Sequence, residues 1–220
     1  MKADEVQDHQ KRQDQHLNLN EGKALVQLAR RAIASYLETN QFITAPGELS
    51  ESFQRKSGVF VTLKTTGPEQ ELRGCIGFPY PDQRLVDATI KAAVYAATED
   101  PRFPRVSLSE LKSSIIMEIT VLTVPHILKT KDRKNLPELI EVGRHGLIVQ
   151  GHGSSGILLP QVATEWKWDA SEFLLNCCLK AGLPPDSWLL DDVEVKVFEG
   201  EIFEEVEPEG EVSRKTIGDA

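Results

Sequence analysis

Apolar residues recur at helical spacing in three stretches of the chain, and these stretches predict its main helices. The first covers residues 24–37, with Asn20 as a candidate capping residue. The second begins at Asp82 and runs to about residue 98, and the third covers 173–180. The polar face of the first helix is not strongly basic, so we expect its apolar face to pack on the protein's own sheet rather than on a membrane. Two shorter helices are expected at 136–142 and from Pro160.

Short runs rich in β-branched residues predict the strands. Residues 58–64 and 71–78 flank the turn dipeptide Gly67-Pro68 and are expected to pair as a hairpin. The run 115–124 is apolar at nearly every position, which predicts a strand buried on both faces. Further strands are expected at 147–150, 157–159 and 193–203. Because hairpins and helices mix along the chain, the pattern predicts an α+β fold with a mixed or antiparallel sheet, flanking helices and room for two lobes.

The two ends of the chain are polar. Residues 1–16 are rich in Gln and charged residues and lack an apolar segment, so we expect a disordered tail and no secretory signal. Residues 17–205 hold the predicted elements and are expected to form one α+β domain. Eight acids and two bases lie between 199 and 220, which gives −6 of the net charge of −9 and leaves −3 for the rest. Residues 206–220 are therefore expected to be an acidic, solvated tail.

Charge and composition argue against several classes of function. The chain is acidic and has no basic stripe, so binding along a nucleic-acid backbone is not expected. No apolar run approaches the ~20 residues that a membrane-spanning helix needs. Three cysteines, an odd number, do not make a disulfide framework, and a reducing cytoplasm is the expected location.

The segment 72–77 (LRGCIG) contains the strongest candidate site. Side chains alternate along a strand, so if its apolar side chains enter the core, Arg73 and Cys75 share the opposite, accessible face. A guanidinium two residues from a thiol favours the thiolate, which is the nucleophilic and metal-binding form. Gly74 and Gly77 fit a place where a ligand or another backbone approaches closely. The alternative is a small core cysteine in a strand with bulge glycines.

Three further polar positions are candidates for the same site. Asp100 and Arg102, followed by Phe103, lie in a loop that prolines make rigid. The loop either presents a carboxylate and a guanidinium to a substrate or joins them in a mutual ion pair. His145 lies between glycines, where it is either a general base or an ordinary surface-turn histidine. Cys75 and His145 would together make a nucleophile–base pair. The sequence does not place the two within reach of each other.

Other motifs carry less weight. The segment 151–156 (GHGSSG) matches GxGxxG in letters, but residues 157–160 separate it from the next helix, so a hairpin turn explains the glycines better than dinucleotide binding. The histidines show no zinc spacing, and Cys177 and Cys178 lie among apolar helix residues, so no structural zinc site is predicted, and a metal site assembled from distant residues stays open. Glu165 belongs to a short helix whose start offers backbone donors to a ligand; otherwise it is an ordinary helix acid.

Several of these segments together resemble the AMMECR family. The matching segments, in chain order, are 58–63 (GVFVTL), 72–77 (LRGCIG), 100–104 (DPRFP), 143–147 (GRHGL), 158–163 (LLPQVA), 168–169 (WD) and 180–184 (KAGLP). The resemblance extends over residues 19–205 and is closer to archaeal or bacterial members than to animal ones. It implies a compact α+β fold with two unequal lobes and a cleft between them, lined by the strand of 72–77. It also implies association with a Memo-like protein and a radical SAM protein, and it gives no cofactor, reaction or substrate.

Two kinds of function are compatible with these observations. In the first, Cys75 is a nucleophile or metal ligand, with His145 as base and Asp100 as a further catalytic residue, and the site takes a small, anionic ligand. The ligand-binding residues would be Arg73, Gly74, Gly77, Arg102, Phe103 and Glu165. In the second, the same face recognises a partner protein, or a nucleotide or RNA fragment, without chemistry. A third interpretation is that Cys75 and the glycines serve strand packing alone.

Overall fold

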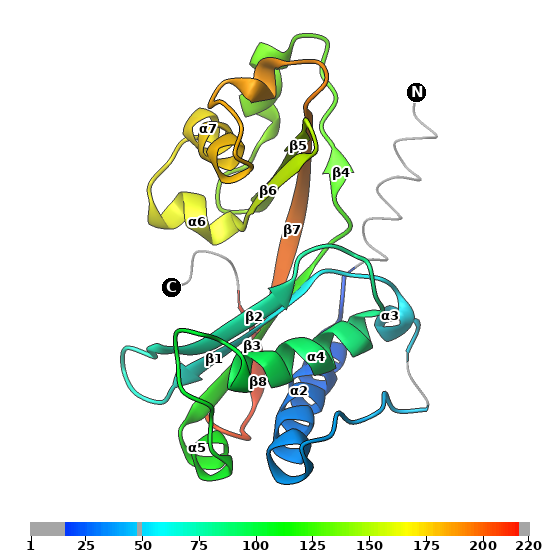
Figure 1. The fold of residues 1–220 in the computed structure, drawn as a ribbon, viewed down its shortest axis with the longest axis vertical. Helices are drawn as coiled ribbons and strands as arrows, with labels where there is room; N and C mark the ends of the chain where they lie inside the picture. The colour runs from blue at the N-terminus through cyan, green and yellow to red at the C-terminus, as the bar shows by residue number, and fades with distance from the viewer. Residues whose placement is uncertain (1–15, 48–49, 216–220) are drawn as a thin grey trace. The chain divides into compact units, whose positions relative to one another are not determined.

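The computed structural model describes residues 16–47 and 50–215 of the chain. Residues 1–15 of the expected N-terminal tail therefore lie outside the described residues. The described chain divides into two compact units of unequal size (Figure 1). Unit 1 contains the described residues up to Leu122 together with Glu201–Lys215, and unit 2 contains Thr123–Gly200. Strand β7 (Glu194–Glu205) belongs to both, because its first half lies in unit 2 and its second half in unit 1.

Unit 1 is built on a sheet whose centre is the strand β1 (Val59–Thr65). β1 pairs antiparallel with β2 (Leu72–Phe78) on one side and with β3 (Ile115–Leu122) on the other. The second half of β7 follows β3, and β8 (Val212–Lys215) pairs with β7, which gives the order β2-β1-β3-β7-β8. The predicted hairpin is therefore confirmed. The prediction of a strand buried on both faces is also confirmed for β3, apart from the half-buried Glu118.

Two long helices cover one face of this sheet (Figure 1). Helix α2 (Leu19–Thr39) contacts β3 and β8, and α4 (Leu85–Thr98) contacts β1 and β2. Their apolar faces and alternate residues of β1 form one core, so the first helix packs on the protein's own sheet as expected. Two short helices, α3 (Glu51–Gln54) and α5 (Leu108–Ser113), complete the unit.

Unit 2 has its own sheet and core. β5 (His145–Gly151) pairs antiparallel with β6 (Ser154–Leu158) and with the first half of β7, which also pairs with the short β4 (His126–Ile127). His152 and Gly153 join β5 to β6 with left-handed φ angles of 50° and 78°, so the glycine-rich segment is a hairpin turn as predicted. Helix α7 (Ala170–Lys180) packs on β5 and β6. The helices of this unit are α6 (Pro160–Glu165), α7 (Ala170–Lys180) and the 3₁₀ helices η1 (Arg133–Leu139) and η2 (Ser187–Leu189).

The two long helices are capped by other residues than those expected from the sequence. α2 is capped by Asn18 rather than Asn20, and the Asn18 side chain takes part in a capping box. α4 begins at Leu85, after Arg84 rather than after Asp82. Arg84 has an extended backbone and forms an isolated bridge with Lys56, so the chain is not yet helical at Asp82.

The acidic stretch near the C-terminus is part of the fold. Within the expected tail, residues 212–215 form β8, and residues 216–220 lie outside the described residues. Three glutamates of β7 are buried, and each has a cationic partner. The ion pairs are Glu201–Arg214, Glu204–Lys64, Glu204–Lys215 and Glu205–Arg30. A count of charge along the sequence misses these pairs, because two of the four cations, Arg30 and Lys64, come from distant elements.

Candidate functional site

The two glycines of β2 lie where neighbouring atoms leave no room for a side chain. A Cβ atom at Gly74 would lie 2.2 Å from the carbonyl oxygen of Ala96 in α4. A Cβ atom at Gly77 would lie 2.2 Å from the ring of Phe60 in β1. The close neighbours of both glycines therefore belong to unit 1 itself, and the approaching backbone expected at Gly74 is that of helix α4.

Arg73 connects β2 to the loop and helix that follow α4. Its Nε atom donates a 2.6 Å hydrogen bond to Glu110 at the first turn of α5, and its Nη2 atom donates to the same carboxylate at 3.2 Å. Its Nη1 atom donates to the backbone carbonyl of Pro104 at 2.9 Å. The guanidinium of Arg73 is thus occupied by partners other than the thiol of Cys75, and its role in this structure is to hold α5 against the sheet.

Cys75 is half-buried, and its Sγ atom lies 3.4 Å from the hydroxyl oxygen of Thr62 on β1. Burial raises the pKa of the Cys75 thiol. The hydrogen bond from Thr62 and the charge of Arg102 lower this pKa, whereas the charges of Glu118 and Asp100 raise it, and the net shift is upward. The prediction that Arg73 shifts Cys75 toward the thiolate is therefore wrong, because burial outweighs the positive charge nearby and the pKa is raised overall.

The Asp100 carboxylate organises the candidate site. Its side chain is only 2% exposed, and it accepts a 2.8 Å hydrogen bond from the backbone N–H of Cys75. It also accepts hydrogen bonds from Arg102, through the backbone N–H at 3.1 Å, Nε at 3.0 Å and Nη2 at 2.7 Å. These bonds with Arg102 hold the pKa of Asp100 well below its usual range. The mutual ion pair considered for this loop is thus present, and it is anchored to β2.

Arg102 is fixed at one edge and open at the other. Besides its bonds to Asp100, its Nη2 atom donates to the carbonyl of Cys75 at 3.3 Å, and its guanidinium carbon lies 5.4 Å from the centre of the Phe103 ring. The side chain is nevertheless 53% exposed. Among the described residues, its Nη1 atom has no hydrogen-bond partner. The loop therefore holds a guanidinium with one edge open to solvent, beside the segment that carries Cys75.

A row of polar side chains next to Cys75 was not predicted from the sequence. The strand register places Thr62 between Cys75 and Glu118, so all three lie on the face of the sheet away from α4. Lys64, two residues along the same face, donates 2.6 Å hydrogen bonds to Glu118 and to Glu204. The signal that could have identified this row is Glu118, a single acid within the apolar run 115–124.

Glu118 and Glu204 have different proton affinities. Burial raises the pKa of Glu118, and Lys64 only partly opposes the shift. Burial also disfavours the charge of Glu204, but hydrogen bonds from Lys215 and Lys64 bring its pKa below the usual value. Two interacting carboxyl groups with pKa values shifted in opposite directions are typical of acid–base sites, although structural ion-pair networks produce them too.

The other predicted site residues, His145 and Glu165, belong to unit 2. His145 begins β5, and its Nδ1 atom accepts a 3.0 Å hydrogen bond from the backbone N–H of Glu141. Glu165 is the last residue of the six-residue helix α6 and is exposed, so it does not lie at the start of that helix. The predicted site residues that unit 1 brings together are Arg73, Cys75, Asp100, Arg102 and Phe103. Because His145 belongs to unit 2, its pairing with Cys75 stays a prediction.

The described residues show neither a metal-ligand cluster nor a membrane-spanning helix. No three side chains of His, Cys, Asp or Glu in the described part of the chain are grouped as ligands of one metal ion. None of the helices formed by residues 16–47 and 50–215 combines the length and the apolar character that crossing a membrane requires.

Comparison with known proteins places this geometry in a family. The AMMECR1 family model matches residues 26–203. A Pyrococcus furiosus protein, PF1979, is 52% identical over 198 residues, which are 89% of this chain and 93% of that protein. The Methanopyrus kandleri protein MK0488 is 50% identical over 203 residues, 92% of this chain and 97% of that protein. The crystal structure of the uncharacterised protein PH0010 from Pyrococcus horikoshii matches with a TM-score of 0.79 and 49% identity, over 91% of this chain and 98% of that one. These relatives are archaeal, and the chain belongs to the AMMECR1 family.

Proposed function

We propose that unit 1 binds a small anionic ligand at the open edge of Arg102, beside Cys75. The observation that carries the proposal is the arrangement of the Arg102 guanidinium. Asp100 and the Cys75 carbonyl fix its position, and yet more than half of the side chain is exposed and its Nη1 atom has no partner among the residues described. A cation held in place before binding loses little conformational freedom when a ligand arrives, which favours affinity.

The surroundings of Arg102 indicate which anion fits. Asp100 already balances one positive charge, so a singly charged group such as a carboxylate suits the site better than a polyphosphate. The ring of Phe103 flanks the guanidinium and offers an apolar surface to the carbon part of the ligand. The expected ligand is thus a small organic acid.

The thiol of Cys75 determines whether the site is also catalytic. In the binding form of the proposal, Cys75 acts as a neutral hydrogen-bonding group beside the ligand, in agreement with its raised pKa. In the catalytic form, Cys75 would be the nucleophile and would need a base to take its proton. His145 is the predicted base, with Asp100 and Arg102 holding the ligand. The binding form needs only the anion at Arg102. The catalytic form needs the same bound anion and, in addition, a base that takes the proton of Cys75.

Titration of isotopically labelled protein with acetate, succinate and phosphate, followed by amide NMR, tests the binding form. We expect the carboxylates to shift the amides of β2 and of residues 100–103, and Arg102→Gln to abolish the shifts. Arg84→Gln is the matched control, because Arg84 is also an exposed arginine in an ion pair, with Asp87. If the same amides shift equally in wild type, R102Q and R84Q, or do not shift in any of them, Arg102 is not the anion site.

A second candidate function, partner binding, rests on unit 2. The ring of Trp166 is stacked on Trp168 with a centroid distance of 5.9 Å and an interplanar angle of 18°, and Trp166 is 68% exposed. Exposed tryptophans are enriched at protein interfaces, where they bury a large apolar area. A purified Memo-like protein and a purified radical SAM protein, the partners that the family resemblance implies, are the proteins to test. Trp166→Ala should weaken binding at least tenfold; unchanged binding would remove this surface from consideration.

A further inference from the structure

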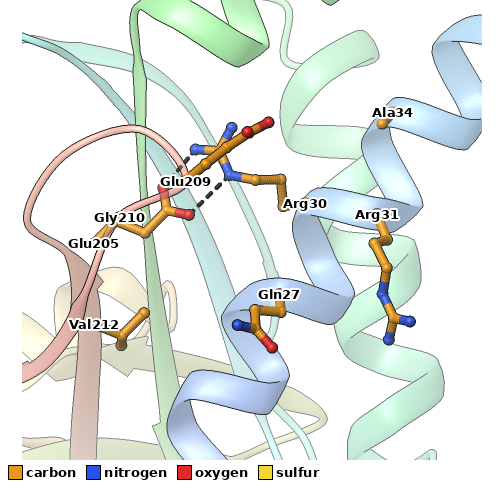
Figure 2. A pocket seen from close by; sticks show the side chains of 8 residues that line it. All are labelled: Gln27, Arg30, Arg31, Ala34, Glu205, Glu209, Gly210 and Val212. Atoms are coloured by element: carbon orange, nitrogen blue, oxygen red, sulfur yellow. Dashed lines mark hydrogen bonds and ion pairs between the residues drawn. The ribbon is translucent and has the colours of Figure 1, made fainter.

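A cavity of about 450 Å³ opens in unit 1 between helix α2 and the turn that joins β7 to β8 (Figure 2). Its volume lies in the range of about 300–1,000 Å³ that is typical of small-molecule sites. The wall on α2 consists of residues spaced three and four apart, which share one face of a helix: Gln27, Arg30, Arg31 and Ala34. The opposite wall consists of Glu205, Glu209, Gly210 and Val212. None of these residues belongs to the site around Cys75.

The inner part of the cavity is a rigid ion pair. The Nε atom of Arg30 donates to Glu205 at 2.8 Å and its Nη2 atom donates to the same carboxylate at 2.5 Å, as Figure 2 shows. The guanidinium also donates to the carbonyls of Leu111 at 2.6 Å and Ile115 at 2.7 Å, and Glu205 accepts from the N–H of Met117 at 3.0 Å. Arg30 is only 8% exposed. This pair cannot rearrange freely, so it gives the cavity a fixed polar base.

One donor of Arg30 remains available. A guanidinium carries five N–H groups, and four hydrogen bonds are made, one by Nε, one by Nη1 and two by Nη2. The fifth N–H, on Nη1, has no acceptor among the described residues. A buried donor without an acceptor is costly.

The outer part of the cavity carries charges that have no partner within the described part of the chain. Gln27 and Arg31 lie one turn apart on α2, and both are exposed. Glu209 lies on the turn across from them, also exposed, and its φ angle of 62° is left-handed. Arg31 and Gln27 thus supply donors on one wall, and Glu209 supplies acceptors on the other. Ala34 on the α2 wall and Val212 on the opposite wall supply small apolar surfaces.

We propose that this cavity binds a small zwitterion with a carboxylate and an ammonium group, of the kind that a free amino acid provides. The carboxylate would accept from Arg31 and the Gln27 amide on the α2 wall, and the ammonium group would donate to Glu209 on the turn. Two arginines and two glutamates line the cavity, so their formal charges cancel. A ligand with separated charges and no net charge matches this arrangement, whereas a simple anion or amine leaves one wall without a partner. The proposal is independent of the one for Arg102.

Amide NMR spectra of the labelled protein, recorded with each of the common L-amino acids in turn at millimolar concentration, test the proposal. We expect at least one amino acid to shift amides of residues 27–34 and 205–212. Its deaminated and decarboxylated counterparts, an acid and an amine with the same carbon chain, should bind at least tenfold more weakly. An acid that binds as tightly as the amino acid, or the absence of any shift in these residues, would overturn the proposal.

Matched variants assign the binding to the two walls. Arg31→Gln and Glu209→Gln should each weaken binding of the best amino acid at least tenfold, and both proteins should fold, because both side chains are exposed. Lys23→Gln on α2 and Glu207→Gln on the same turn are the controls, since neither residue lines the cavity. If the two controls lose as much affinity as R31Q and E209Q, the effect is one of overall charge and the site is not the one proposed.

Discussion

The backbone N–H of Cys75 donates a 2.8 Å hydrogen bond to the buried carboxylate of Asp100, which joins strand β2 to the loop after α4. The same carboxylate holds the guanidinium of Arg102 through two side-chain hydrogen bonds. Strand, acid and cation therefore behave as one connected group. The position of the proposed anion-binding edge is set by the backbone of the segment that carries Cys75.

Asp100→Asn should destabilise the protein by about 1.5–3 kcal/mol at pH 7, because it replaces charge-assisted hydrogen bonds by neutral ones. The loss should depend on pH. The pKa of Asp100 is lowered in the folded protein, so its contribution to stability is present above the unfolded value of about 3.9 and is lost as the pH falls toward the folded value. In urea unfolding, the gap between wild type and D100N should therefore narrow from pH 7 to pH 3 by roughly 1 kcal/mol. A gap of the same size at both values would show that the charge of Asp100 contributes nothing.

Gly74→Ala should lower the free energy of unfolding by about 1–3 kcal/mol or more, because the new methyl group would meet the carbonyl oxygen of Ala96, which belongs to a helix and cannot move away alone. Gly47→Ala is the control, since nothing lies within 4 Å of a Cβ atom at that position. Chemical denaturation of both variants measures the difference. Equal stabilities would mean that α4 does not pack against β2 as closely as described.

Glu118→Gln should lower the pKa of the Cys75 thiol, because the charge of Glu118 raises it. The rate of Cys75 alkylation by iodoacetamide, read peptide by peptide at pH 7.5, should then rise severalfold. Arg102→Gln should have the opposite effect, because the charge of Arg102 lowers the same pKa.

Two references make these alkylation rates interpretable. Glu38→Gln removes an exposed acid of α2 and should leave the Cys75 rate unchanged. Cys177, whose pKa burial raises to about 12, should stay unmodified in every folded variant. Changes of the same sign in E118Q and R102Q would contradict the assignment of these charges to the environment of Cys75.

The elements of the fold were largely predictable, because the sequence patterns that specify them are local. The β1–β2 hairpin follows from two β-branched runs around Gly67-Pro68, and the β5–β6 turn follows from its glycines. The helix starts were less accessible, because Asn18 and Asn20 are both acceptable caps, and only the capping box that Glu21 completes decides between them.

The candidate site was predictable only in part. The rigid loop with Asp100 and Arg102 was recognisable, but their bond to the Cys75 backbone joins residues 25 apart and needs the fold. The predicted effect of Arg73 on the thiol failed for a related reason. Glu110 in α5 occupies the guanidinium, and the burial of Cys75 depends on elements that strand alternation alone does not reveal. Glu204 and Glu205 of β7 show the same limit, since their partners Lys64 and Arg30 are distant in sequence.

The most direct test of anion binding at Arg102 is the rate of Cys75 alkylation with and without a short carboxylate, at constant ionic strength set with chloride. A carboxylate bound at Arg102 would cover the site and offset the positive charge that lowers the pKa of the thiol, so we expect slower alkylation of Cys75 in wild type. The same carboxylate should leave the rate unchanged in Arg102→Gln. A wild-type rate that does not respond to saturating carboxylate, or that responds equally in R102Q, would contradict the proposed site.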